Sequence, residues 1–135
     1  MAALCSRSEH CESEIRQKLQ RAAIAASDID DIIDRLREAD FINDARYCSA
    51  FSRDKMRFAG WGRRKIAYAL SAKRLPQSEI QQALAALDAD EYMAVARRVA
   101  AARERFGGER EALMRHMLSR GFTVDEAQQA ICTDA

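Results

Sequence analysis

The fold is decided by the segment Ile66–Leu84, IAYALSAKRLPQSEIQQAL, in which four large apolar residues recur with gaps of 4, 10 and 4 positions. Two apolar residues four positions apart lie on one face of a helix. The gap of ten leaves room for the end of one helix, a turn, and the start of the next. Pro76 falls near that start, the one helical place where proline is tolerated. The segment therefore predicts a hairpin of two helices.

The same spacing occurs twice more in the chain. The three sets are Ile15, Leu19, Ile29 and Ile33; Ile66, Leu70, Ile80 and Leu84; and Leu113, Met117, Ala127 and Ile131. Successive sets are 51 and 47 residues apart, and an apolar residue recurs in each turn, at Ile24, Leu75 and Phe122. Short polar residues that can cap the second helix of each hairpin recur at Ser27, Ser78 and Asp125. We therefore predict three copies of a helical repeat.

Two of the hairpins are preceded by another helix-like stretch, at Asp44–Phe58 and Asp90–Phe106. Glycines follow both stretches, at 60 and 62 and at 107 and 108, as they do where a helix ends in a left-handed residue. The complete repeat is thus three helices. We expect the first copy to lack its leading helix, because only about eight residues precede its hairpin.

We predict an all-α chain of eight helices, near 9–22, 27–38, 43–58, 62–74, 77–86, 90–105, 109–120 and 123–131. No segment alternates as a strand does. The expected units are a truncated two-helix repeat at 1–40, a basic three-helix repeat at 41–87, and a third repeat of three helices at 88–135. Units of this size bury little surface alone, so we expect tandem repeats stacked into an elongated, curved array.

The charge of the chain is unevenly distributed. Residues 43–75 hold nine Lys or Arg against two acids, whereas residues 1–42 hold six against nine and residues 76–135 hold seven against ten. The net charge of +1 therefore combines a middle of 9 − 2 = +7 with two mildly acidic ends. This asymmetry indicates that the chain contacts its partner through the middle unit.

We expect the partner-binding residues to be Arg46, Arg53, Arg57, Trp61, Arg63, Arg64, Lys65, Lys73 and Arg74. The cations at 63–65 open a helix, where the helix dipole favours negative charge, so they indicate an anion such as DNA phosphate or an acidic patch on a filament. The alternative is a solvated surface. Trp61 is either a packing residue or an exposed interface anchor. For Lys73 and Arg74 a structural role suffices, since the dipole favours cations in a last turn.

The helix at 43–58 is expected to have a basic side and an aromatic side. Arg46, Arg53 and Arg57 lie along one side, at spacings of seven and four. Tyr47, Phe51 and Phe58 form a neighbouring stripe, which we predict to be core. A second basic patch is expected in the third unit, at Arg97, Arg98, Arg103 and Arg105.

Four motifs follow one another in a fixed order: Phe41-Ile-Asn-Asp-Ala-Arg-Tyr, Gly60-Trp-Gly-Arg-Arg-Lys-Ile, Leu70-Ser-Ala-Lys, and a helix of the form acid-Ile-x-x-Ala-Leu. In this order they resemble the RecX family of bacterial regulators of the RecA recombinase. The resemblance implies tandem three-helix repeats without catalytic activity. It also implies binding to RecA filaments on DNA, in or near the helical groove, restraint of recombination, ATP hydrolysis and co-protease activity, and weak binding to DNA. The family often has a glycine where this chain has Arg74, whereas the third copy keeps Gly121.

The sequence shows no motif of an enzyme or of a metal site. It contains no P-loop and no Gly-rich dinucleotide turn, and neither His10 nor His116 is placed with an obvious nucleophile and acid. The spacing of Cys5, His10 and Cys11 is not that of a zinc site. We therefore expect no catalysis, no cofactor and no bound metal.

No apolar run approaches the ~20 residues that a bilayer-spanning helix needs. The opening MAALC is too short for the core of a signal peptide. We expect a cytoplasmic monomer without membrane contact, with Cys5, Cys11, Cys48 and Cys132 as reduced thiols.

Two functions are open for the basic middle. The first is a modulator that binds RecA filaments. The second is a direct, largely sequence-independent DNA-binding protein that uses residues 43–86 as a helix-turn-helix-like unit. Its central helix offers Arg and Lys followed by Ala67, Ala69 and Ala72, and lacks the Asn or Gln that read base edges. We therefore expect weak, salt-sensitive binding to bare DNA and tighter binding to a RecA–DNA filament.

Overall fold

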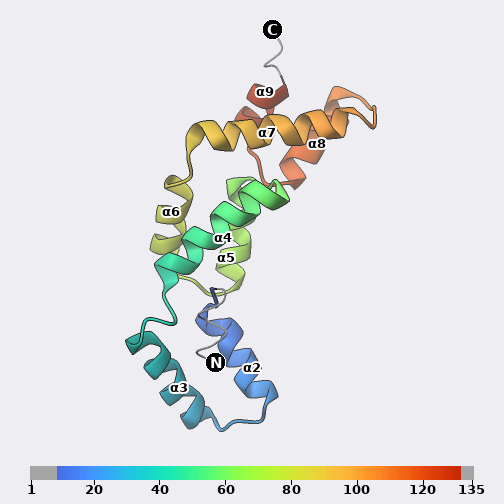
Figure 1. The fold of residues 1–135 in the computed structure, drawn as a ribbon. Coiled ribbons are helices and arrows are strands. Elements are labelled where there is room, and N and C mark those ends of the chain that lie inside the picture. The colour runs from blue at the N-terminus through green and yellow to red at the C-terminus, as the bar shows by residue number, and fades with distance from the viewer. Residues whose placement is uncertain (1–8, 132–135) are drawn as a thin grey trace.

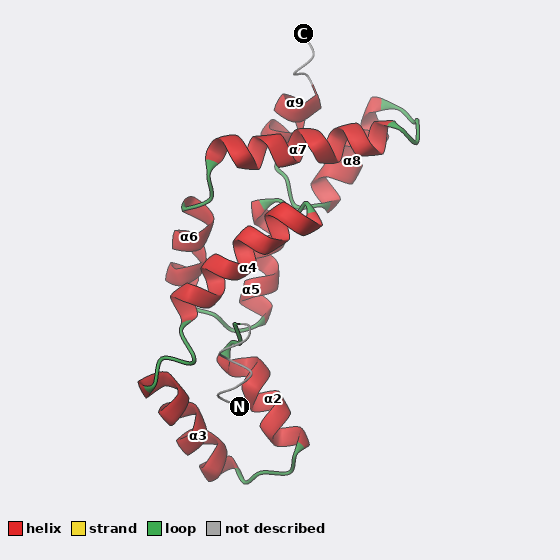
Figure 2. Cartoon of the chain, in the orientation of Figure 1, coloured by secondary structure: helices red, strands yellow, loops and turns green. Residues whose placement is uncertain are grey.

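A computed structural model describes residues 9–131 and is helical through most of that range. Its helices are α2 (Glu12–Arg21), α3 (Ala26–Glu38), α4 (Asp44–Ala59), α5 (Arg63–Ala72), α6 (Gln77–Ala85), α7 (Ala89–Glu104), α8 (Arg110–Ser119) and α9 (Val124–Ile131). Figure 2 shows these helices joined by loops, and residues 9–131 contain no strand. The predicted bounds agree with the observed ones to within three residues, so the all-α prediction is confirmed.

The helices form three successive groups along an elongated, curved molecule (Figure 1). The hairpin of α2 and α3 lies at one end, α4 to α6 lie in the middle, and α7 to α9 lie at the other end. In the middle and third groups the leading helix packs against the last helix of its hairpin, α4 on α6 and α7 on α9. The expectation that the first copy lacks a leading helix concerns residues 1–8, which lie outside the described range.

The spacing that predicted the repeat also marks the core. Eleven of its twelve apolar residues are buried, and the twelfth, Ile131, is partly buried against apolar residues of the middle and third groups. The turns repeat in the backbone as well, because Ala23, Arg74 and Gly121 are all left-handed, with φ of 60°, 65° and 100°. A residue with a side chain adopts this conformation at a cost of roughly 1–2 kcal/mol. The second turn therefore keeps the repeat geometry although Arg74 stands where glycine is the easier choice.

The predicted caps Ser27 and Ser78 are wrong. Both lie inside their helices, whose N-caps are Ala25 and Pro76, and neither cap residue makes a side-chain capping bond. Both helices begin two residues earlier than they would if the serines were their N-caps. No side chain at these N-caps therefore accepts the free amides of the first turn.

Asp125 also lies inside its helix, α9. The amide of Glu126 donates to the hydroxyl of Thr123 at 3.2 Å, and the amide of Thr123 donates to the Glu126 carboxylate at 2.9 Å. This reciprocal pair is a capping box. The cap of the third hairpin is therefore two residues before the predicted one.

The apolar core is divided into two clusters. The first consists of Ile15, Leu19, Ile29, Ile33, Leu36 and Ile42, all from the first hairpin and the segment after it. The second runs through the middle and third groups from Tyr47 to Ala130, and Cys11 joins it from the start of α2. The middle and third groups thus share one core, as expected for stacked repeats. The first hairpin keeps a core of its own.

Two further expectations concern single features of the described chain. Among residues 9–131, no helix has both the length and the apolar character that crossing a bilayer requires. Cys11 and Cys48 are free and buried, and burial raises the pKa of the Cys48 thiol to about 11. Cys5 and Cys132 lie outside the described residues.

Candidate partner-binding surface

The cations at 63–65 begin α5, and this helix start is docked on the third group. The amide of Gly62 donates to the carbonyl of Arg120 at 2.7 Å. The amide of Arg64 donates to the carbonyl of Gly121 at 3.1 Å. Both carbonyls lie at the C-terminal end of α8, which carries partial negative charge. The cations at 63–65 were predicted to meet an anion of a partner. The end of α8 places part of that negative charge next to them within the chain.

Arg63 lies at the centre of this junction. Its guanidinium stacks on the ring of Tyr92 at 3.9 Å and donates to the Leu84 carbonyl and the Glu126 carboxylate, both at 3.3 Å. The Tyr92 hydroxyl accepts from the Arg63 amide at 2.9 Å and donates to Glu126 at 3.0 Å. Burial, with the nearby Glu126 charge, raises the pKa of Tyr92. The side chain of Arg63 is only 31% exposed. Because it contacts Tyr92 and Glu126, it links the middle group to the third group.

The arginine side of α4 is also engaged within the chain. Arg46 pairs with Glu9 and, at 3.0 Å, with Asp40, which ties α4 to the first group. Arg57 makes two bonds to Glu91 at the start of α7, at 2.7 and 3.1 Å. Two of the predicted partner-binding residues are therefore paired with acids of neighbouring groups.

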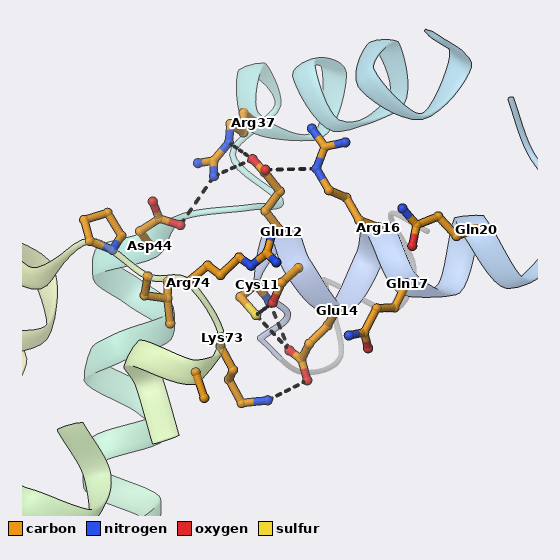
Figure 3. A pocket seen from close by; sticks show the side chains of 14 residues that line it. Cys11, Glu12, Glu14, Arg16, Gln17, Gln20, Arg37, Asp44, Lys73 and Arg74 are labelled. Carbon is orange, nitrogen blue, oxygen red and sulfur yellow. Dashed lines mark hydrogen bonds and ion pairs between the residues drawn. The ribbon is translucent and has the colours of Figure 1, made fainter. Parts of the chain in front are cut away.

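Lys73 and the first hairpin meet at a polar junction (Figure 3). Lys73 pairs with Glu14 at 3.3 Å. Arg37 of α3 pairs with Glu12 at 2.9 Å and with Asp44 at 3.5 Å. The pairs of Lys73 with Glu14 and of Arg37 with Asp44 link the first hairpin to the middle group. Each of these ion pairs is worth little when partly exposed.

A cavity of about 640 Å³ lies in this junction. It is lined on one side by the start of α2, including Cys11 and Glu14, and on the other by the turn after α5, including Lys73 and Arg74. Burial raises the pKa of Glu14, but hydrogen bonds from Cys11 and the charge on Lys73 outweigh it, so the pKa lies below its usual value. The cavity is thus a space between repeats bordered by charges of both signs.

Three of the predicted arginines are exposed and have no acidic partner among residues 9–131. Arg53 donates to the hydroxyl of Ser49 at 3.2 Å, and Arg64 and Arg74 make no ion pair with any residue between 9 and 131. These side chains are available to an external anion. They come from α4, from the first turn of α5 and from the turn after it.

A second set of cations surrounds an aromatic pair. Trp61 packs partly buried against the core in T-shaped contact with Phe51, at 6.3 Å between ring centroids, and keeps part of its side chain accessible. The amine of Lys65 lies 4.6 Å from the Trp61 ring, and that of Lys55 lies 4.8 Å from it and 5.5 Å from Phe51. The amine of Lys73 lies 5.9 Å from the Phe51 ring. Ring faces attract cations, so these amines are held at the surface of the aromatic pair.

Phe58 and Tyr68 extend this surface and are 83% and 79% exposed. The prediction that Phe58 belongs to the core is wrong. Its stripe on α4 is buried at Tyr47, where Glu14 and Cys11 approach the phenol, and open at the other end. Phe58 and Lys55 line a shallow hollow of about 330 Å³ there. We call Phe51, Lys55, Phe58, Trp61, Lys65 and Tyr68 the lysine–aromatic band.

Lys55, Phe58 and Tyr68 were absent from the residues predicted to bind a partner. The sequence contains a signal for two of them, because Phe51, Lys55 and Phe58 stand at i, i+4 and i+7 and share one side of α4. That side is distinct from the one that carries the arginines. The structure therefore divides the predicted basic surface into an arginine side, largely paired, and a lysine–aromatic side.

The second basic patch lies on α7 and the turn after it. Arg97, Arg98 and Arg105 are exposed, and Arg98 donates to the carbonyl of Arg57 at 2.8 Å. Burial, together with the charges of Arg103 and Arg120, lowers the pKa of His116. Residues 9–131 hold no cluster of His, Cys, Asp and Glu that could bind a metal ion.

Family models match most of the first two groups. The model described as the first three-helix domain of RecX matches residues 2–36, and the one described as the second three-helix domain of RecX matches residues 43–84. Together they cover more than half of the chain.

Several relatives are named "Regulatory protein RecX". The one from Herminiimonas arsenicoxydans is 31% identical over 133 residues, which are 91% of this chain and 82% of the relative. Those from Levilactobacillus brevis and Clostridium beijerinckii are each 30% identical over 128 residues, covering 90% and 89% of this chain. The chain spans only 48% and 59% of the length of these two relatives.

Two crystal structures share the fold. RecX from Lactobacillus salivarius superposes with a TM-score of 0.79 over 96% of this chain and 88% of that one, at 24% identity. A second structure, of regulatory protein RecX, gives a TM-score of 0.83 over 98% of this chain and 69% of that one, at 22% identity. At these identities the likeness concerns the arrangement of the helices.

Proposed function

Because the chain belongs to the RecX family, we propose that it regulates the RecA recombinase, mainly as an inhibitor. In this proposal it binds the RecA–DNA filament along its groove and modulates recombination, ATP hydrolysis and co-protease activity. The observation that carries the proposal is the match of the chain to both three-helix domains of RecX. We propose that it acts in the cytoplasm as a monomer without catalytic activity.

The shape and charge of the chain support this function. An elongated array of stacked groups offers a long surface to a filament (Figure 1). The middle group is the basic part of the chain, and positive charge steers a protein toward an anionic partner. We propose units at 1–40, 41–87 and 88–135, with the central one making the principal contact.

The ion pairs within the chain reduce the number of predicted cations that we propose to contact the filament. Arg46, Arg57, Arg63 and Lys73 are engaged by acids of the chain. Arg53, Arg64 and Arg74 are exposed without an acidic partner among residues 9–131. We therefore propose that these three arginines, with Lys65 and the accessible part of Trp61, contact the filament.

The test is DNA-dependent ATP hydrolysis by RecA with the protein added at far below one copy per RecA. The test variant carries Arg53→Ala, Arg64→Ala and Arg74→Ala. The control variant loses the same charge from exposed positions of the first hairpin, through Lys18→Ala, Arg21→Ala and Arg35→Ala. Circular dichroism confirms that both variants are folded.

We expect the parent and the control to inhibit hydrolysis and the test variant to inhibit far less. Equal inhibition by the two variants would show that the three arginines of the middle group do not make the contact with the filament. No inhibition by the parent would overturn the proposed regulation of RecA and favour direct DNA binding. In that case the affinity for bare duplex should fall with salt at a slope of roughly −0.9 per phosphate contacted.

A further inference from the structure

The lysine–aromatic band alternates rings and cations across α4 and α5. Lys65 stands three residues before Tyr68 on α5, so the two side chains are neighbours. Lys65 in turn lies over the ring of Trp61, and Lys55 lies near the rings of both Trp61 and Phe51. Phe58 stands three residues after Lys55 on α4 and lines the same hollow. The order along the band is Tyr68, Lys65, Trp61, Lys55 and Phe58.

The two end rings are not needed by the core. Phe58 and Tyr68 are 83% and 79% exposed, and neither belongs to either apolar cluster. Exposed apolar area is unfavourable by roughly 25 cal/mol per Å². The rings between them are fixed, because Trp61 packs edge-on against Phe51. The band is thus a preformed surface with an uncovered ring at each end.

The cations of the band are available to an external anion. Lys55 and Lys65 make no ion pair with residues 9–131 and are held over rings. Arg64, exposed and four residues before Tyr68, adds a third positive charge. Asp54, which lines the hollow beside Phe58, is the one acid there. The band and its margin therefore remain positively charged.

We propose that the lysine–aromatic band binds single-stranded nucleic acid, with bases stacked on Phe58 and Tyr68 and phosphates held by Lys55, Lys65 and Arg64. A single strand alternates flat bases with anionic phosphates, and proteins bind it by combining cations with aromatic stacking surfaces. In a duplex the base faces are covered by their neighbours. An acidic protein segment would engage the lysines but leave both rings uncovered.

The inference deepens the proposed function and rests on it, since the band lies within the surface proposed to face the RecA–DNA filament. Its test contains no RecA. Trp61 is the only tryptophan of the chain and lies in the middle of the band, so its fluorescence reports binding there. The probes are a short oligothymidylate, an abasic oligonucleotide of the same length and charge, a duplex of the same length, and polyglutamate.

We expect the parent to bind oligothymidylate on the order of tenfold more tightly than the abasic strand for each base that stacks. A variant with Phe58→Leu and Tyr68→Leu should lose that preference and keep its salt dependence, because both lysines remain. The matched control is Phe106→Leu, the same substitution at a ring that is 81% exposed outside the band. The control should bind as the parent does.

Equal affinity of the parent for the thymidylate and the abasic strand would overturn the inference. So would a preference for the duplex, an undiminished preference in the double variant, or tighter binding to polyglutamate. These measurements contain no RecA, so none of these results would change the outcome of the RecA assay, and the proposed function would stand. Conversely, ring-dependent strand binding without inhibition of RecA would overturn the proposed function alone.

Discussion

Substituting Gly62 by Ala should separate the middle group from the third. Gly62 is the N-cap of α5 and has ordinary extended dihedrals, with φ −82° and ψ 169°. A Cβ atom there would overlap the backbone of Gly121 and lie 2.5 Å from the amide nitrogen of Phe122. No flexible side chain can move aside, because the obstacle is the backbone of the turn after α8. The two groups must therefore part.

The cost follows from the contacts at this junction. Parting the groups breaks the bonds from the amides of Gly62 and Arg64 to the third group, each worth about 0.5–1.5 kcal/mol. Overpacking of a close contact adds about 1–3 kcal/mol. We expect the free energy of unfolding to fall by about 3 kcal/mol, a large part of the roughly 5–15 kcal/mol that holds a domain folded.

Urea unfolding, followed by circular dichroism and by Trp61 fluorescence, measures this cost. The control is Gly107→Ala, at an exposed glycine with φ 75° and no atom within 4 Å of the added Cβ. It should lose only about 1 kcal/mol, from backbone strain. Equal losses in the two variants would refute the argument, because the close approach at Gly62 would then contribute nothing beyond the strain of an ordinary loop.

Three further outcomes are expected. Arg63→Met should lower the free energy of unfolding by about 1–3 kcal/mol, since Arg63 holds a partly buried junction, whereas Arg64→Met should change it by less than about 0.5 kcal/mol in the same urea titration. Deletion of residues 110–135 should make thermal melting broader and lower, because the third group shares its core with the middle one, and an unchanged melting curve would refute the shared core. Glu12 and Glu14 have a pKa below their usual 4.5 in the folded chain, so their stabilisation is present above about pH 4.5 and is lost as the pH falls through the lowered values. Thermal melting measured from pH 6 to pH 3 should show this loss, and Glu14→Gln should reduce it.

The local sequence pattern was sufficient to predict the helices and the repeat. The apolar spacing located the six helices of the three hairpins and eleven of their buried residues, because a helix face is fixed by its 3.6-residue period. The two leading helices were indicated by the glycines that follow them. Even the left-handed turns recur at the spacing of the repeat, at Ala23, Arg74 and Gly121. The caps were less predictable, since a shift of one or two residues at a helix start decides which side chain can cap it.

The candidate site was predictable only in part. The basic middle group is a property of composition, and the sequence located it correctly on α4 and α5. Whether a given cation is already paired depends on acids far away in the chain. Arg57 meets Glu91 and Arg63 meets Glu126, 34 and 63 residues later. Phe58 was misassigned for a similar reason, because its stripe is covered at one end and open at the other.

The sequence by itself determined the repeat, and the tertiary structure decided how closely the repeats dock. Cys11 and Gly62 are equivalent N-caps, and Arg74 and Gly121 are equivalent turn residues. Gly62 and Gly121 let two backbones meet and bond directly, so the middle and third groups share one core. Cys11 and Arg74 instead border a cavity of about 640 Å³ with ion pairs across it, and the first hairpin keeps a separate core. Periodicity fixes the face that each helix buries, but the approach of two turns depends on side-chain bulk at residues about 60 positions apart.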